Sequence, residues 1–135
     1  MMLYMLDTNI VSYYLRRSLP ALEERVNDAL KRRTIVISVI TRAELRYGQM
    51  GMTPEDRRRP LIDSFFLRLP SVEWSNEAAD QYGVLRHCLK TQGKPIGDMD
   101  TLIAAHALAE KLILVTHNTR HFENVPHLKL EDWMV

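Results

Sequence analysis

Residues 34–44 read Thr-Ile-Val-Ile-Ser-Val-Ile-Thr-Arg-Ala-Glu and contain the clearest strand-to-helix transition in this chain of 135 residues. The run 34–40 is rich in β-branched residues, which are typical of a strand buried in a sheet. A polar, helix-forming pattern follows at once. The segment therefore predicts a buried strand over 34–40 and a helix that begins at Thr41.

Four other segments on either side of this one are strand candidates. The apolar runs 3–6 and 112–115 have the length and composition of buried strands, 71–74 is a weaker candidate, and 128–130 suits an edge strand. With 34–40, this makes about five strands, which alternate with helical segments. Such alternation indicates an α/β domain with a largely parallel sheet, and no linker or repeat divides residues 1–135 into more than a single domain.

The segments between the strand candidates have helical spacing. Leu22, Val26 and Leu30 are four residues apart and define one helical face. Residues 54–69 also have a helical pattern, which Pro60 is expected to kink or divide. Two further helices are expected after a cap at Ser75 and over residues 99–110.

The composition excludes some classes of protein. A formal net charge of +1 provides no overall attraction to nucleic acid, so any polyanion site must be a local cluster of Lys and Arg. The only cysteine, Cys88, cannot form an intrachain disulfide and fits a reducing compartment. No apolar run approaches the roughly 20 residues that a membrane-spanning helix needs, so we expect a cytoplasmic protein without a membrane partner.

Three acids lie where strand candidates give way to helices or where a helix opens: Asp7, Glu44 and Asp100. In an open α/β fold these junctions meet at the carboxyl edge of the sheet. Converging carboxylates repel one another unless a positive charge lies between them, and such oxygen ligands suit Mg²⁺ or Mn²⁺. The three acids predict a metal-dependent enzyme that acts on phosphate esters.

Each acid also has a structural interpretation. Asp7 can cap a helix. Thr41 and Glu44 have the spacing of a capping box, in which the glutamate reaches back to the backbone of the threonine. Asp98 and Asp100 point to different sides of one helix, and we assign Asp100 to metal and Asp98 to capping or an outer-shell role.

Polar residues near the C-terminus can extend this site. Thr116 and Asn118 follow the strand candidate 112–115, and Asn118 can also cap the next short helix. His117 and His121 have the spacing of a metal pair, but no supporting cysteine or histidine makes a zinc site. His106 lies in an apolar helix and is expected to be buried and hydrogen-bonded.

Substrate contacts are expected from basic side chains near the acids. The candidates are Arg42, Arg46, Lys94 and Arg120. A set of apolar residues can either face a partner or pack in the core, and core packing is the commoner role. These residues are Leu61, Phe65, Phe66 and Leu69.

Four motifs in order along the chain resemble a PIN-domain ribonuclease, in particular the VapC-type toxins of bacterial toxin–antitoxin pairs. They are Asp7-Thr-Asn, Thr41-x-x-Glu44, Pro95-Ile-Gly-x-x-Asp100-x-Leu-Ile-Ala-Ala-His-Ala and Val115-Thr-x-Asn118-x-x-x-Phe122, followed by Trp133. No single motif is specific, but the four in register span essentially the whole chain.

The resemblance implies a central parallel sheet with helices on both faces and an acidic cluster that binds Mg²⁺ or Mn²⁺. Asp7, Glu44 and Asp100 match the acidic positions of the family, whereas many PIN domains have a fourth acid where this chain has Asn118. The resemblance also implies cleavage of RNA, with tRNA a frequent target. The partners that it implies are a small antitoxin that blocks the site and a second copy of the chain, in a homodimer or a larger toxin–antitoxin assembly. Hydrolysis by water predicts 5′-phosphate and 3′-hydroxyl ends.

Two other functions fit parts of the sequence. One is a catalytically idle module of the same fold that binds RNA or protein, with the carboxylates acting only as caps. The other is a phosphatase with an aspartyl-phosphate intermediate, but the Asp-x-Asp signature of that chemistry is interrupted here by Asn9.

Overall fold

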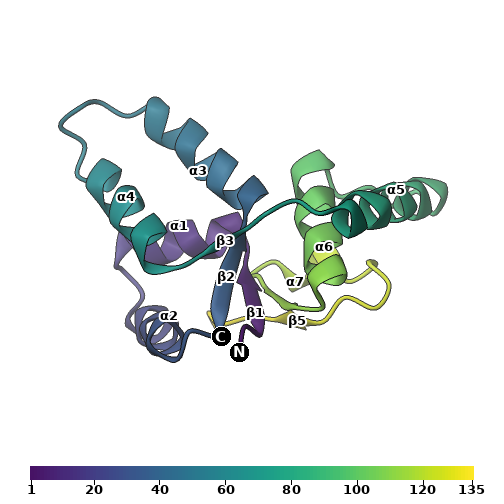
Figure 1. The fold of residues 1–135 in the computed structure, drawn as a ribbon, viewed down its shortest axis with the longest axis horizontal. Coiled ribbons are helices and arrows are strands. Elements are labelled where there is room, and N and C mark those ends of the chain that lie inside the picture. Colours follow the sequence, from purple (N-terminus) through teal and green to yellow (C-terminus); the bar gives the residue numbers. More distant parts are fainter.

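The computed structural model describes all 135 residues, and a five-stranded parallel sheet forms its centre (Figure 1). The strands lie in the order β3 (Ser71–Val72), β2 (Ile35–Ser38), β1 (Tyr4–Leu6), β4 (Ile113–Val115) and β5 (Leu130–Glu131). All four neighbouring pairs are parallel. Parallel strands need long crossover connections, which the helices supply. The α/β fold predicted from the sequence is confirmed.

Seven helices connect or follow these strands. They are α1 (Thr8–Arg16), α2 (Pro20–Arg32), α3 (Val39–Met50), α4 (Arg58–Arg68), α5 (Asn76–Thr91), α6 (Asp98–Glu110) and α7 (Thr119–Phe122). None of them combines the length and the apolar character that crossing a membrane requires.

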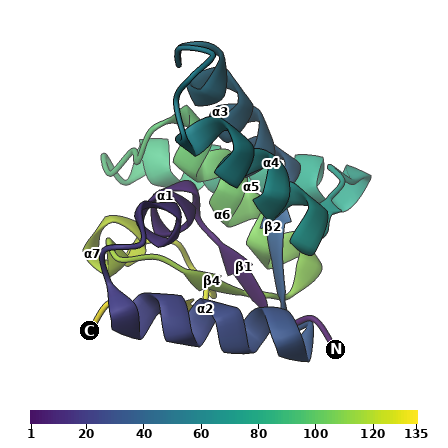
Figure 2. The same ribbon diagram turned by 90° about the vertical axis from the view of Figure 1, so that its left-hand side faces the viewer.

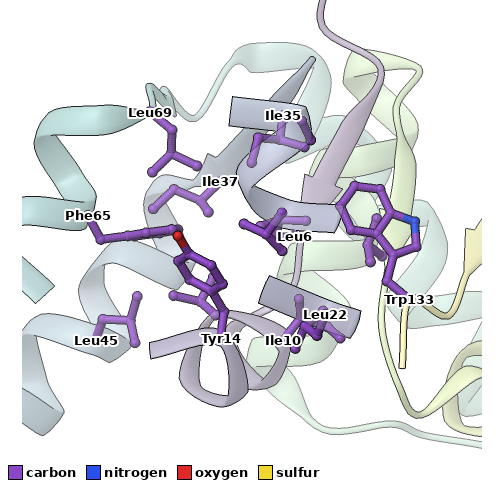
Figure 3. Close-up of a cluster of buried hydrophobic side chains, with 14 of the residues drawn as sticks. Leu6, Ile10, Tyr14, Leu22, Ile35, Ile37, Leu45, Phe65, Leu69 and Trp133 are labelled. Carbon is purple, nitrogen blue, oxygen red and sulfur yellow. The ribbon is translucent and has the colours of Figure 1, made fainter. Parts of the chain in front are cut away.

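One face of the sheet is covered by α1, α2 and α4, which lie toward the viewer in Figure 2. Alternate strand residues such as Leu6 and Ile37 point to this face, because successive side chains of a strand point to opposite sides. Figure 3 shows them packed with Tyr14 of α1 and Phe65 of α4, whose ring centroids are 5.8 Å apart. Phe65, Phe66 and Leu69 thus pack in the core, whereas Leu61 is only partly buried and its neighbour Ile62 is buried instead.

The other face of the sheet is covered by α5 and α6, on the opposite side in Figure 1. The remaining strand residues, including Met5 and Leu114, pack there against Leu85 and Leu89 of α5 and Ile103 of α6. The helix–sheet–helix layering leaves the strand ends as the part of the sheet that helices do not cover. The expected helices on both faces are confirmed.

The carboxyl ends of the three central strands meet at one edge. The β1 and β4 ladders are in register at Leu6 and Val115. The backbone N–H of Asp7 donates to the carbonyl of Val115 at 3.0 Å, which extends the ladder by one residue. The side chains that follow β1 and β4, Asp7 and Thr116, are therefore neighbours.

The strand predicted over 34–40 is shorter in the structure, and α3 begins at Val39 rather than at Thr41. The reason is Ser38, whose hydroxyl accepts a hydrogen bond from the backbone N–H of Ile40 at 3.0 Å and caps the helix. Val39 and Ile40 have strong strand propensity, but the sheet ends at Ser38. Tertiary context overrides propensity at these two positions.

The kink or division expected at Pro60 is wrong, because α4 is one continuous helix from Arg58 to Arg68. Pro60 lies in the first turn of this helix, where its missing N–H would have no partner anyway. The cap at Ser75 is confirmed, because its hydroxyl accepts from the N–H of Ala78 at 3.1 Å.

Candidate active site

Asp7 is the most buried acid of the site, with 4% of its surface exposed. It follows β1 directly, and its Oδ1 accepts a hydrogen bond from the backbone N–H of Ile10 at 2.8 Å. The capping role considered for Asp7 is therefore real. It uses one of the two carboxylate oxygens, so the cap does not prevent the other from binding a ligand.

The pKa of Asp7 is raised above its ordinary value. Burial is the largest cause, and the negative charges of Asp100 and Glu44 raise the pKa further. The groups that lower it are the Thr116 hydroxyl and the Ile10 N–H, neither of which is a cation. The fold thus brings the three predicted acids within electrostatic reach of one another.

Glu44 does not form the capping box expected with Thr41. Because α3 begins at Val39, Thr41 lies in the first turn and Glu44 lies farther along the helix. Oε1 of Glu44 instead accepts from the Thr8 hydroxyl at 2.6 Å, and the Thr8 and Thr41 oxygens are 3.1 Å apart. A carboxylate only accepts, so Thr8 gives its proton to Glu44 and accepts the proton of Thr41. This chain of hydroxyls holds Oε1 of Glu44 against the start of α1.

Asp100 lies in the first turn of α6, as predicted. Its Oδ2 is 2.8 Å from Nε2 of His121. Asp98 is not the cap, because Gly97 takes that position with a positive φ of 92° and Asp98 becomes the first residue of the helix. Oδ1 of Asp98 lies 3.8 Å from Arg86 of α5. The two aspartates therefore have separate partners, consistent with their separate assignment.

Thr116 and Asn118 both lie at this edge of the sheet. Thr116 is fully buried, and its hydroxyl accepts from the backbone N–H of Asn118 at 3.1 Å. Asn118 occupies the cap position of α7, but its side chain makes no capping hydrogen bond. The exposed amide of Asn118 is consequently free to contact a ligand.

The histidines at the C-terminal side do not form a metal pair. Nδ1 of His117 lies 3.0 Å from Asp132, whereas His121 contacts Asp100. Sequence reasoning considered His117 and His121 only together and missed the contact of His121 with an acid of the site. It also missed the role of Thr8, although Thr8 is part of the Asp-Thr-Asn motif.

His106 is fully buried and hydrogen-bonded, as expected. Its ring nitrogens lie 2.8 Å from the Ser38 hydroxyl and 3.0 Å from the carbonyl of Glu73. Burial is the main reason that the pKa of His106 is lowered. Since Ser38 also caps α3, this contact joins the start of the helix that carries Glu44 to the helix that carries Asp100.

The basic candidates differ in how their charges are used within the chain. Arg46 pairs with Asp63 and lies over the ring of Phe66. Arg42 lies over the same ring but has no ion pair. Nζ of Lys94 contacts the amide oxygen of Asn124 at 3.4 Å. Arg120, next to His121, is exposed and has no ion pair. Of the four candidates, only Arg46 is therefore neutralised by a carboxylate.

The donor atoms of the three acids fit a divalent cation. No group of three histidine, cysteine or acidic side chains forms a complete ligand set. Mg²⁺ does not require one, because it keeps several waters and uses one or two carboxylates together with substrate phosphates. The negative charges of Asp100 and Glu44 raise the pKa of Asp7, and a cation between the acids would offset this repulsion. Asp7, Asp100 and Glu44 thus supply the oxygen donors that a hard divalent cation prefers.

Comparison with known proteins agrees with this geometry. The PIN domain family model matches residues 4–128. Ribonuclease VapC2 of Rickettsia felis is 39% identical over 98% of each chain, and the tRNA(fMet)-specific endonuclease VapC of Shigella flexneri is 38% identical over 98% of this chain and 99% of that protein.

Solved structures of similar proteins have the same fold. A crystal structure of VapBC2 from Rickettsia felis bound to a promoter DNA fragment matches with a TM-score of 0.89 and 38% identity, covering 98% of this chain and 99% of that one. DNA-bound VapBC from Salmonella typhimurium matches with a TM-score of 0.91 and 34% identity over the same shares. The chain therefore belongs to the PIN-domain family and, within it, to the VapC ribonucleases.

Proposed function

We propose that this chain is the toxin of a toxin–antitoxin pair, a cytoplasmic endoribonuclease that uses Mg²⁺ or Mn²⁺ to hydrolyse RNA phosphodiesters. The observation that carries the proposal is the electrostatic coupling of Asp7 with Asp100 and Glu44 at the carboxyl edge of the sheet. Three carboxylates from three separate segments have no structural need to face one another. Their convergence is explained if they share a cation.

Each residue of the site has a role in this proposal. Asp7 and Asp100 would hold the cation, and Glu44 would contact it directly or through water. When bound, such a cation makes its water more acidic and neutralises charge on the phosphoryl oxygens. Glu44, whose Oε1 accepts from the Thr8 hydroxyl, would orient the attacking water or accept its proton. Asn118, at the edge of the site, would contact substrate or an outer water.

The 5′-phosphate and 3′-hydroxyl ends follow from the use of water as nucleophile, because the 2′-hydroxyl of the RNA takes no part. The proposal is tested by incubating purified protein with total RNA, with and without Mg²⁺, and sequencing both ends of every fragment. We expect discrete cuts only with Mg²⁺, all with 5′-phosphates. Fragments that carry 2′,3′-cyclic phosphates, or equal cutting in excess chelator, would contradict the mechanism. The positions of the cuts would identify the RNA target, and tRNA(fMet), the target named for two of the relatives, is the first candidate.

Arg120 is our leading candidate for contact with an RNA phosphate, because its charge has no carboxylate partner and it adjoins His121. In an Asp7→Asn background that cannot cut, Arg120→Ala should weaken binding similarly for different RNA sequences. The slope of log affinity against log salt should flatten by about 0.7 for each lost contact to single-stranded RNA. The measurement is fluorescence anisotropy at several salt concentrations.

The control for this prediction is Arg32→Ala on α2, an exposed arginine that pairs with Asp28 at 2.9 Å. It removes the same charge from the protein at a distance from the acids. Equal salt slopes for the Arg120 and Arg32 variants would show that Arg120 makes no phosphate contact.

The proposed partners are the RNA substrate, a small antitoxin and a second copy of the chain. The antitoxin is supported by solved structures of relatives described as VapBC. The homodimer and any larger assembly follow from the family resemblance, and light scattering of the toxin alone and with its antitoxin would measure both.

A further inference from the structure

His121 makes the one side-chain contact that the protein offers to Asp100. Its Nε2 lies 2.8 Å from Oδ2 of Asp100 and 2.9 Å from the backbone carbonyl of Ile96. Both neighbours are acceptors, since a carbonyl oxygen has no proton and the carboxylate ligand of a metal must be ionised. Nε2 must therefore carry a hydrogen and donate it, whether or not the ring as a whole is charged.

The donated hydrogen determines what His121 can do in the site. A nitrogen that carries a proton cannot bind a metal, so Nε2 is not a ligand while this contact exists. The contact instead occupies Oδ2 of Asp100, and no protein group donates to Oδ1. This is the arrangement found around metal sites, where an outer residue fixes the orientation of a ligand.

His121 is held in place by the core beneath it. The next residue, Phe122, is 2% exposed, and its ring meets the imidazole edge to face at a centroid distance of 5.1 Å. Ile96, whose carbonyl shares the hydrogen of Nε2, is also buried in the core cluster that contains Phe122. The imidazole is therefore tied to α7, to the loop before α6 and to Asp100 at once.

We propose that His121 is a positioning residue for the divalent cation, which orients Asp100 through Oδ2 so that Oδ1 is available to bind. The inference rests on the proposed function, because it assigns a purpose to Asp100 as a ligand. It also explains why the spacing of His117 and His121 does not make a second metal site: each ring is directed to a different aspartate.

The test measures the affinity for Mn²⁺ directly, by calorimetric titration without RNA. His121→Ala should weaken Mn²⁺ binding about 10- to 100-fold, the usual loss when such an outer contact is removed. His121→Gln should keep much of the Mn²⁺ affinity, because the amide N–H of glutamine can reach the position of Nε2. His121→Asn has the same amide on a shorter side chain and should bind Mn²⁺ as weakly as His121→Ala.

His117→Ala is the matched control, because this histidine lies in the loop just before α7 and contacts Asp132, which is not part of the site. Its Mn²⁺ affinity should stay within about twofold of the wild type, since that contact orients no ligand. In cleavage assays, His121→Ala should need more cation for half-maximal activity but approach the wild-type rate at saturation. A role in folding alone would lower the melting temperature without cation and leave the Mn²⁺ affinity of the folded protein unchanged.

Unchanged or tighter Mn²⁺ binding by His121→Ala and His121→Asn, in a wild type that binds Mn²⁺ and cuts RNA, would overturn this inference and leave the proposed function standing. A wild type that cuts RNA without binding Mn²⁺ would overturn both, and the two failures are therefore distinguishable.

Discussion

Replacing Asp7 with asparagine is expected to reduce RNA cleavage about a thousandfold or more while the protein stays folded. The rate falls because the site loses one negative charge that would hold the metal. The metal's stabilisation of phosphoryl charge is worth several kcal/mol, and about 1.4 kcal/mol corresponds to a factor of ten in rate. The fold is expected to survive because asparagine is as good a helix cap as aspartate and can still accept from the Ile10 N–H. Single-turnover cleavage at saturating Mg²⁺ measures the effect.

The same substitution should raise the stability of the cation-free protein at neutral pH. The pKa of Asp7 is raised in the folded state, so the folded protein holds this proton more tightly than the unfolded chain. The stability that the protonated group contributes is complete below the ordinary pKa of 3.8 and is lost as the pH rises through the higher folded pKa. Asparagine cannot ionise, so the variant should keep this stability at pH 7.

Thermal melts in chelator between pH 4 and pH 8 test this second effect. As the pH increases, the melting temperature of the wild type should fall relative to that of Asp7→Asn. Added Mg²⁺ should raise the melting temperature of the wild type more than that of the variant. A variant that is less stable than wild type at pH 7 would mean that the carboxylate of Asp7 is a structural group, and its inactivity would then say nothing about catalysis.

Expression of the toxin without its antitoxin should arrest growth, and Asp100→Asn should relieve the arrest whereas Asp98→Asn should not. The two aspartates open the same helix and carry the same charge, so both substitutions remove the same favourable interaction with the helix dipole. They differ in their partners, since Asp100 contacts His121 of the site and Asp98 lies 3.8 Å from Arg86. Colony counts after induction, with immunoblots to equalise protein levels, compare the pair.

Relief by both substitutions would point to the stability of α6 rather than to the chemistry of Asp100. Arrest that persists in Asp100→Asn and in Asp7→Asn would rule out the acids as the source of toxicity. With purified proteins, Asp98→Asn should cut RNA within a few-fold of wild type, because its weak, exposed ion pair contributes about 1 kcal/mol or less.

The sequence predicted the architecture well because its signals are local. Runs of β-branched and apolar residues identified all five strands, and each acid of the site was recognised by its position at the end of a strand or the start of a helix. Helix starts were less well predicted. The spacing of Thr41 and Glu44 fits a capping box, but α3 begins two residues before Thr41. The sheet ends at Ser38, and the Ser38 hydroxyl caps the helix at that point.

The sequence alone thus determined the α/β fold and the three acids that converge at one edge of the sheet, because parallel strands must end together at that edge. The cap that Asp7 provides is local, but only the tertiary structure decided what Glu44 and Asp100 contact. Glu44 is paired with Thr8, 36 residues away, and Asp100 with His121, 21 residues away. Contacts at these separations depend on how helices pack against the sheet, a property that the spacing of residues along the chain does not encode.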